Sequence, residues 1–124
     1  MMPLCLAAGA LAATLATGTF TLAWTHSIEK VRWEEDWRIV DARLLLVAAR
    51  IRGTGAGMEM PAGAVLRDGV WHYRPDFPPQ ARVLLAHSPH TAGYTLCIDG
   101  RCRPLAGFLP GLPETATISL AACP

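Results

Sequence analysis

Apolar and polar residues alternate, or apolar residues run in short blocks, through most of the chain after residue 18. The first strand predicted by this pattern has one apolar face: Phe20, Leu22, Trp24, His26 and Ile28. The block "LLLVAARI", residues 44–51, is long and apolar enough for a central strand that is covered on both sides. Glycine and proline interrupt the pattern about every ten residues, which is typical of an all-β protein.

The pattern therefore predicts a small antiparallel β-sandwich or barrel of about seven or eight strands, formed by residues 18–124 as a single all-β domain. With 124 residues, of which 52% are hydrophobic, the chain is long enough to close one core. The formal net charge is +1, and charged residues of both signs are interspersed. Such a chain offers no basic face to a phosphate backbone, so we expect no nucleic-acid partner.

Residues 1–17 differ from the rest, because the stretch "MPLCLAAGALAATLAT" contains no charged side chain. This composition is typical of a signal peptide cleaved after Ala16, or of a short membrane anchor; a buried cytosolic segment is the third alternative. About 17 residues at ~1.5 Å each is marginal for spanning a ~30 Å hydrocarbon layer, and no Lys or Arg precedes the run. We expect an exported protein, periplasmic or otherwise extracytoplasmic, that contacts the membrane only through this N-terminal segment.

The spacing of the cysteines supports export. Asp99-Gly100 is the dipeptide that a two-residue type I′ turn prefers, and such a turn puts Cys97 opposite Cys102. At a non-hydrogen-bonded pair the α-carbons are ~4.5 Å apart, at the short end of the range that a disulfide accepts. This spacing could also be half of a zinc site, but no second pair completes four ligands. We expect a Cys97–Cys102 disulfide, Cys5 inside the leader and a free thiol at Cys123.

The stretch "HSIE", residues 26–29, resembles a hydrolytic triad because it brings together His26, Ser27 and Glu29. Adjacent residues of a strand point to opposite faces of the sheet, so the His26 base would not reach the Ser27 hydroxyl. We therefore predict no catalytic residue in this stretch. His26 is expected to be buried and hydrogen-bonded to a neighbouring strand.

Two other patterns do not predict a cofactor. The glycine-rich loop "GTGAG", residues 53–57, has the spacing of neither the dinucleotide fingerprint nor the P-loop. Its glycines, Gly55 and Gly57 among them, more simply permit positive φ angles or a close backbone approach. Of the four histidines, only His87 and His90 are close in sequence, and no carboxylate spacing supports a metal site.

The charged residues around Trp33 suggest a binding role. Trp33 lies between Arg32 and Glu34 in the sequence. On an exposed rim, an aromatic ring beside a guanidinium would hold a small organic anion. The acidic run of Glu34, Glu35 and Asp36 is most typical of a solvated bend.

Three stretches, "HSIEKVRWEEDWRI", "LLLVAARIRGTGAGME" and "RDGVWHY", resemble the uncharacterised bacterial family called domain of unknown function 1850. The resemblance runs from Phe20 to about Leu105. Its most specific pieces are the His26-Ser27 pair, an acidic residue at Glu35 or Glu34, and the glycine loop 53–57. Members of the family often belong to gene neighbourhoods of tripartite ATP-independent periplasmic (TRAP) uptake systems with a TAXI-type solute receptor. The resemblance therefore implies an accessory role in solute uptake, with a TRAP transporter permease or a TAXI receptor as partner.

These observations favour an exported accessory or binding module over an enzyme. The candidate ligand- or partner-binding residues are His26, Ser27, Arg32, Trp33, Glu34, Glu35, Gly55 and Gly57. One alternative is a small exported enzyme that uses His26 and Glu35, which requires the two side chains to meet in one cleft. Another is a structural or assembly partner in the cell envelope.

Overall fold

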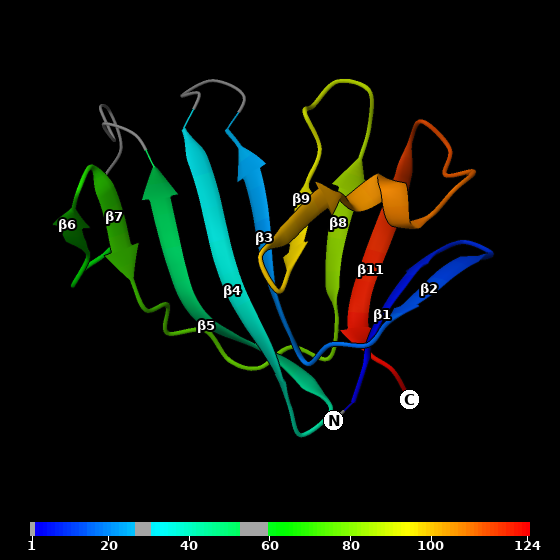
Figure 1. Ribbon diagram of the computed structural model, residues 1–124, viewed down its shortest axis with the longest axis horizontal. Coiled ribbons are helices and arrows are strands. Elements are labelled where there is room, and N and C mark those ends of the chain that lie inside the picture. The colour runs from blue at the N-terminus through cyan, green and yellow to red at the C-terminus, as the bar shows by residue number, and fades with distance from the viewer. Residues whose placement is uncertain (1, 27–30, 53–59) are drawn as a thin grey trace.

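A computed structural model describes residues 2–26, 31–52 and 60–124, and its regular elements are β-strands and one short 3-10 helix (Figure 1). The elements in these residues are β1 (Leu4–Ala8), β2 (Leu11–Leu15), β3 (Thr19–Thr25), β4 (Arg32–Val40), β5 (Arg43–Arg52), β6 (Val65–Arg67), β7 (Val70–Tyr73), β8 (Val83–His87), β9 (Thr95–Ile98), β10 (Arg101–Pro104), a 3-10 helix η1 (Leu105–Phe108) and β11 (Ala116–Ala122). Within these ranges, no helix is long and apolar enough to cross a membrane.

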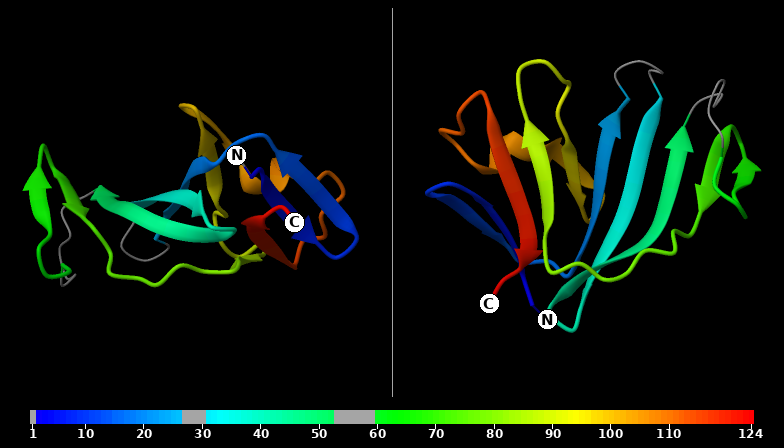
Figure 2. Two further views of the ribbon diagram at one scale, coloured as in Figure 1. Left: turned by 90° about the horizontal axis from the view of Figure 1, so that it is seen from below. Right: turned by 180° about the vertical axis from the view of Figure 1, so that it is seen from behind.

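The strands form two antiparallel sheets. One sheet has the order β2-β1-β11-β8, and the other has the order β10-β9-β3-β4-β5-β7-β6. Neither sheet closes on itself over the described residues, so the architecture is an open sandwich rather than a barrel. The larger sheet extends beyond the smaller one at its β7 and β6 end (Figure 2). The predicted all-β class is confirmed.

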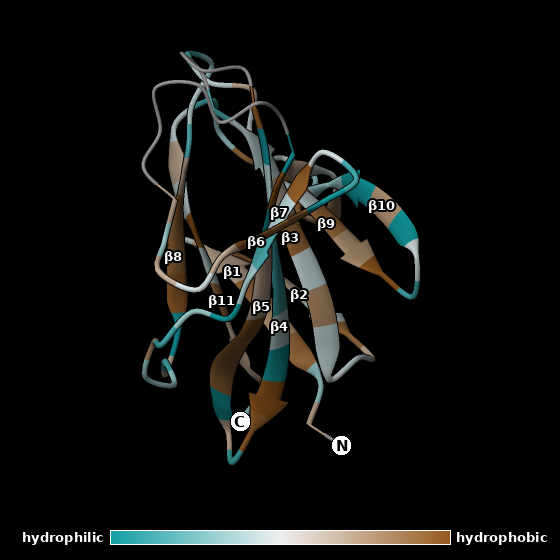
Figure 3. Cartoon of the chain, turned by 90° about the vertical axis from the view of Figure 1, so that its left-hand side faces the viewer, coloured by the Kyte–Doolittle hydropathy of each residue, from teal (hydrophilic) through white to brown (hydrophobic). Residues whose placement is uncertain are grey.

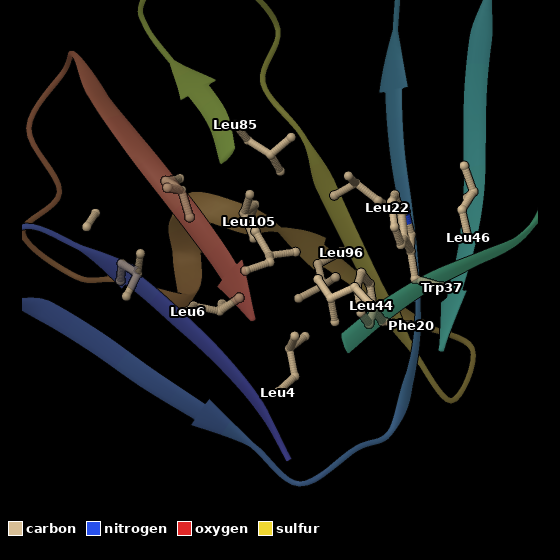
Figure 4. Packing of buried hydrophobic residues seen from close by; sticks show 14 residues of the cluster. Leu4, Leu6, Phe20, Leu22, Trp37, Leu44, Leu46, Leu85, Leu96 and Leu105 are labelled. Carbon is tan, nitrogen blue, oxygen red and sulfur yellow. The ribbon is translucent and has the colours of Figure 1, made fainter. Parts of the chain in front are cut away.

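One hydrophobic core lies between the two sheets (Figure 4). Its inward side chains come from β1 and β11 on one side and from β3, β4, β5 and β9 on the other. They include Leu4, Leu6, Ile118, Leu120, Phe20, Leu22, Trp37, Leu44 and Leu96. Leu105 of η1 and Leu109 also belong to this core. The face of the seven-stranded sheet that carries Phe20, Leu22 and Trp37 is called the inner face below, and the opposite face is called the outer face.

The segment for which we predict a leader is part of this core. β1 lies between β2 and β11, and its Leu4 and Leu6 are 0% exposed. In the structure, packed strands are therefore present before residue 18, where we predict the domain to start. An uncharged run of small and apolar residues suits an interior strand such as β1 as well as it suits a signal peptide, and Gly9, at φ 58°, permits the turn between β1 and β2. Cleavage after Ala16 stays a prediction, and it would remove both strands.

Two disulfides join the described cysteines. Cys97 and Cys102 are bonded at an S–S distance of 2.00 Å and face each other across the β9–β10 hairpin, as predicted. The prediction of a free thiol at Cys123 is wrong, because Cys123 is bonded to Cys5 at 1.97 Å. Pairing of β1 with β11 brings the two ends of the chain together, and the Cys123 amide donates a hydrogen bond to the carbonyl of Pro3 at 2.9 Å.

Candidate functional site

β4 carries the acidic run that we expected in a solvated bend. The run lies instead in mid-strand, with β4 paired to β3 on one side and to β5 on the other. Alternation along the strand turns Arg32, Glu34 and Asp36 to the outer face and turns Trp33 and Glu35 to the inner face. The two faces have different chemistry.

On the outer face, Glu34 and Asp36 are neutralised by arginines from β4 and β5. Arg50 donates to both Asp36 oxygens, at 2.6 and 2.8 Å, and its Nε donates to Glu34 at 3.1 Å. Arg32 and Arg52 also donate to Glu34, at 3.0 and 2.9 Å. The fork of Arg50 matches the carboxylate of Asp36, which is the strong geometry for such a pair. This outer-face network therefore couples β4 to β5 by charge as well as by backbone pairing.

The pKa values of these groups follow from their contacts. Burial alone would raise the pKa of the Glu34 carboxyl, but the three arginine hydrogen bonds outweigh it and hold that pKa below its usual value. The hydrogen bonds from Arg50 lower the pKa of Asp36, and the Thr21 hydroxyl, which donates to it at 2.7 Å, acts in the same direction. The pKa of the Arg50 guanidinium is raised, mainly by Asp36. All three groups are thus charged at neutral pH.

We expect the substitution Arg50→Met to destabilise the protein by about 1–3 kcal/mol at neutral pH. It leaves Asp36 without an arginine partner and removes one of the three arginines that bind Glu34. The two carboxylate side chains are only 33% and 13% exposed, and the figure is reduced for this partial screening. Because the folded-state pKa values lie below the unfolded ones, the stabilisation is present above pH 4.5 and is lost as the pH falls. Urea unfolding at neutral and acidic pH measures both effects.

The matched control is Arg38→Met, on the same strand and face. Arg38 is exposed and makes no ion pair within the described residues. This change should cost less than about 0.5 kcal/mol. Equal losses in the two variants would contradict a specific role for the network.

On the inner face, Glu35 stands in a row of cross-strand neighbours. Leu22 of β3 and Ala49 of β5 flank it, and Tyr73 of β7 lies on the far side of Ala49. A cleft of about 470 Å³ is lined by the larger sheet, by β8 and by the chain that leads into β8. Its lining includes Glu35, Trp37, Tyr73, Phe77, Arg82 and Leu84. Figure 3 shows β8 standing to one side of the larger sheet. We call this space the Glu35 cleft.

Glu35 is half-buried and makes no ion pair within the described residues. Burial raises the pKa of its carboxyl. The indole N–H of Trp37 favours the charged form, although the two groups do not form a well-aligned hydrogen bond. The pKa values of Tyr73 and Tyr94 are raised by burial and, secondarily, by the charge of Glu35, so both phenols lie within its field. Two glutamates that adjoin in the sequence thus have opposite electrostatic environments.

Aromatic rings continue along the inner face from the Glu35 cleft. Trp33 stacks on Trp24 with ring centroids 6.1 Å apart, and Tyr94 packs on Trp24 at 5.6 Å. The indole nitrogens of Trp33 and Trp37 are buried and have no hydrogen-bond partner among the described residues. The expected pairing of Trp33 with Arg32 around an anion does not form, because consecutive strand residues point to opposite faces.

His26 is not the buried strand residue that we expected. β3 ends at Thr25, and His26 is half-buried just beyond it, where its amide donates to the carbonyl of Val31 at 2.8 Å. It lines a separate cleft of about 260 Å³ together with Trp24, Ser88 and Tyr94.

The structure does not bring His26 and Glu35 together. Glu35 pairs with Leu22, and His26 lies four residues further along the chain, or about 13 Å at strand spacing. Ser27, Gly55 and Gly57 lie outside the described residues. In the described ranges, no group of three or more His, Cys, Asp or Glu side chains is arranged to hold a metal ion.

Comparison with known families gives one match. The model of the domain of unknown function 1850 (DUF1850) covers residues 20–105 of the chain. The chain belongs to this family. No curated protein and no solved structure matches it. In this DUF1850 domain the matched range contains the outer-face network and the Glu35 cleft, whereas β1, β2 and β11 lie outside it.

Several residues of the DUF1850 domain's site were missed by sequence reasoning. Arg50 lay inside a run interpreted as a buried strand, and Tyr73 and Phe77 were assigned no binding role. Alternation along residues 32–36 could have separated Glu35 from Glu34. The partners on β5, β7 and β8 could not be found in this way, because they depend on strand register.

We expect Glu35→Gln to raise the stability of the DUF1850 domain at neutral pH by about 1 kcal/mol, or roughly 4 °C in melting temperature. The folded-state pKa of Glu35 lies above the ordinary value of 4.5, so the folded protein binds more protons than the unfolded chain in the interval between the two values. Glu35 therefore lowers stability as the pH rises through that interval. Below pH 4.5 the variant and the wild type should melt alike, and calorimetry across the range tests this.

Glu114→Gln is the control for the change in net charge, because Glu114 is exposed and precedes β11. It should leave the melting temperature unchanged at every pH. A Glu35→Gln protein that is less stable than the wild type at neutral pH would show that Glu35 has a stabilising partner.

Proposed function

We propose that this DUF1850 domain is an extracytoplasmic binding module of a TRAP-type uptake system with a TAXI receptor, and that it holds a small ligand in the Glu35 cleft. The observation that carries the proposal is Glu35 itself. A half-buried carboxylate without a counter-ion costs stability, and such costs concentrate at binding and active sites. The cleft of about 470 Å³ lies in the size range of small-molecule sites, and both aromatic and polar side chains line it.

Two features support the extracytoplasmic location. Both disulfides join described residues, and disulfides persist in oxidising compartments such as the periplasm. The Cys5–Cys123 bond also holds the two ends of the chain beside each other, which suits a domain exposed to proteases outside the cytoplasm.

A binding role also suits the separation of the ionisable groups. General acid–base catalysis needs an acid and a base within reach of one reacting atom. The alternative enzyme would use His26 and Glu35, which line different clefts. Burial and the charge of Glu35 raise the pKa values of Tyr73 and Tyr94. Both phenols are therefore protonated at neutral pH and are poor bases there. Binding therefore accounts for the site with fewer requirements than a reaction.

The test is affinity purification from native membranes with a tag joined through a linker after Pro124, which is exposed. After mild cross-linking, mass spectrometry should find a TRAP permease or a TAXI receptor enriched over an untagged strain. The Glu35→Gln variant should retain the same partner, because Glu35 lies in a cleft rather than on an exposed face. Recovery of neither protein with either chain would refute the uptake role.

A further inference from the structure

We propose that the Glu35 cleft binds an organic ammonium ion. The proposal rests on the proposed function, because it names the chemical class of ligand for the same cleft. The cleft offers the half-buried carboxylate of Glu35, aromatic side chains and apolar side chains. A protonated or quaternary amine with an apolar body complements all three.

The carboxylate lacks the partner that its neighbour has. Glu34 receives hydrogen bonds from three arginines on the outer face, whereas Glu35 has no ion pair among the described residues. A ligand cation would supply the missing charge in a partly desolvated position, where an ion pair is stronger than in water. Burial raises the pKa of Glu35, and a bound cation would reverse that effect.

The aromatic walls favour the same class. Trp37, Tyr73 and Phe77 line the Glu35 cleft together with its carboxylate. Cations are attracted to the faces of such rings, and this is how quaternary ammonium groups are commonly recognised. Tyr73 and Phe77 are the more accessible of the three, since Trp37 is only 4% exposed. An organic anion would instead be repelled by the half-buried Glu35, and Arg82, the cation in the lining, is exposed to solvent.

The other charged groups of the cleft leave the net charge of its lining negative. Arg82 and Asp76 also line it, and both are exposed. Their opposite charges offset each other, so the net charge of the lining remains that of Glu35. Leu46 and Val83 also line the cleft and supply apolar surface for the body of the ligand.

The test compares three probes of similar size and different charge: benzylammonium, benzyl alcohol and benzoate. Each is titrated into the purified full chain at neutral pH and low salt, with calorimetry and tryptophan fluorescence as readouts. Benzylammonium should bind in the millimolar range usual for a fragment, at least about tenfold more tightly than benzyl alcohol. Benzoate should not bind. Preference for benzoate, equal affinity for all three probes, or no saturable binding of benzylammonium would overturn the proposal.

Two variants locate the binding. Glu35→Gln should weaken benzylammonium binding at least about tenfold and leave benzyl alcohol unaffected, whereas Glu114→Gln should change neither. Phe77→Leu, at a position that is 47% exposed and therefore tolerant, should weaken benzylammonium binding by a few-fold. Benzylammonium binding that survives Glu35→Gln intact would also overturn the proposal.

The titrations and the membrane purification test the two proposals separately. A failure to bind benzylammonium would not change which membrane partner is recovered, and the absence of a membrane partner would not change the titrations.

Discussion

A chain that begins at Thr17 should not fold, because the residues it lacks form two strands of the smaller sheet. β1 is an interior strand, paired with β2 and with β11. Without it, Ile118 and Leu120 of β11 would lose the neighbours that bury them. Fully burying a leucine contributes about 1.5–3 kcal/mol, and Leu4 and Leu6 are both 0% exposed. Their loss, with a disulfide and two strands, is comparable to a typical total stability of about 5–15 kcal/mol.

The measurement is circular dichroism and thermal unfolding of the purified truncated chain. It should show no cooperative transition and no near-ultraviolet signal from packed tryptophans. Two point variants calibrate the result: Leu6→Ala should cost about 2–5 kcal/mol, and Ala12→Ser, at an exposed position of β2, should cost less than about 0.5 kcal/mol. A truncated chain that unfolds cooperatively would contradict the role of β1.

A second measurement tests the predicted leader. Cleavage after Ala16 would remove the residues that form β1 and β2 in the fold. Mass spectrometry of the protein taken from the cell envelope shows which N-terminus it carries. A mature chain that starts at Leu4 or earlier agrees with the structure, and one that starts near Thr17 agrees with the leader.

Features specified by local chemistry were predictable from the sequence. The Asp99-Gly100 turn sets the register of β9 and β10, and this register brings Cys97 and Cys102 together. Asp68-Gly69 makes the same kind of turn, with both φ angles positive, and it joins the short strands β6 and β7. The N-terminal segment was ambiguous for a physical reason, since the same uncharged composition suits two environments.

The site was predictable only in part. Glu35 was named as a candidate, but its environment depends on contacts between residues far apart in the sequence. Tyr73 reaches it across β5, and Val83 and Leu84 come from a strand of the other sheet. The outer-face network likewise needs Arg50 beside Glu34, a register that no local pattern specifies. Local rules gave the strands, and long-range pairing determined which side chains meet.

The two disulfides should differ in their contribution to stability. Removing the Cys5–Cys123 bond by a double change to alanine is expected to cost about 4–5 kcal/mol, whereas the same change at Cys97 and Cys102 should cost about 2 kcal/mol. The difference arises in the unfolded chain, because the first bond closes a loop with a sequence separation of 118 residues and the second closes one of 5. The longer loop restricts far more unfolded conformations.

Urea unfolding of both double variants beside the oxidised wild type measures this difference, and the wild type in reductant gives the sum of the two losses. Each double variant removes two sulfur atoms and leaves two alanine methyl groups, so the pairs are matched in chemistry. Part of the loss of stability at Cys123 comes from packing, because this residue is 8% exposed. Backbone pairing of β1 with β11 still holds the neighbouring residues in place when the bond is absent. If the hairpin variant proved the less stable of the two, the chain-entropy explanation would be wrong, and local strain or packing at the β9–β10 turn would have to dominate.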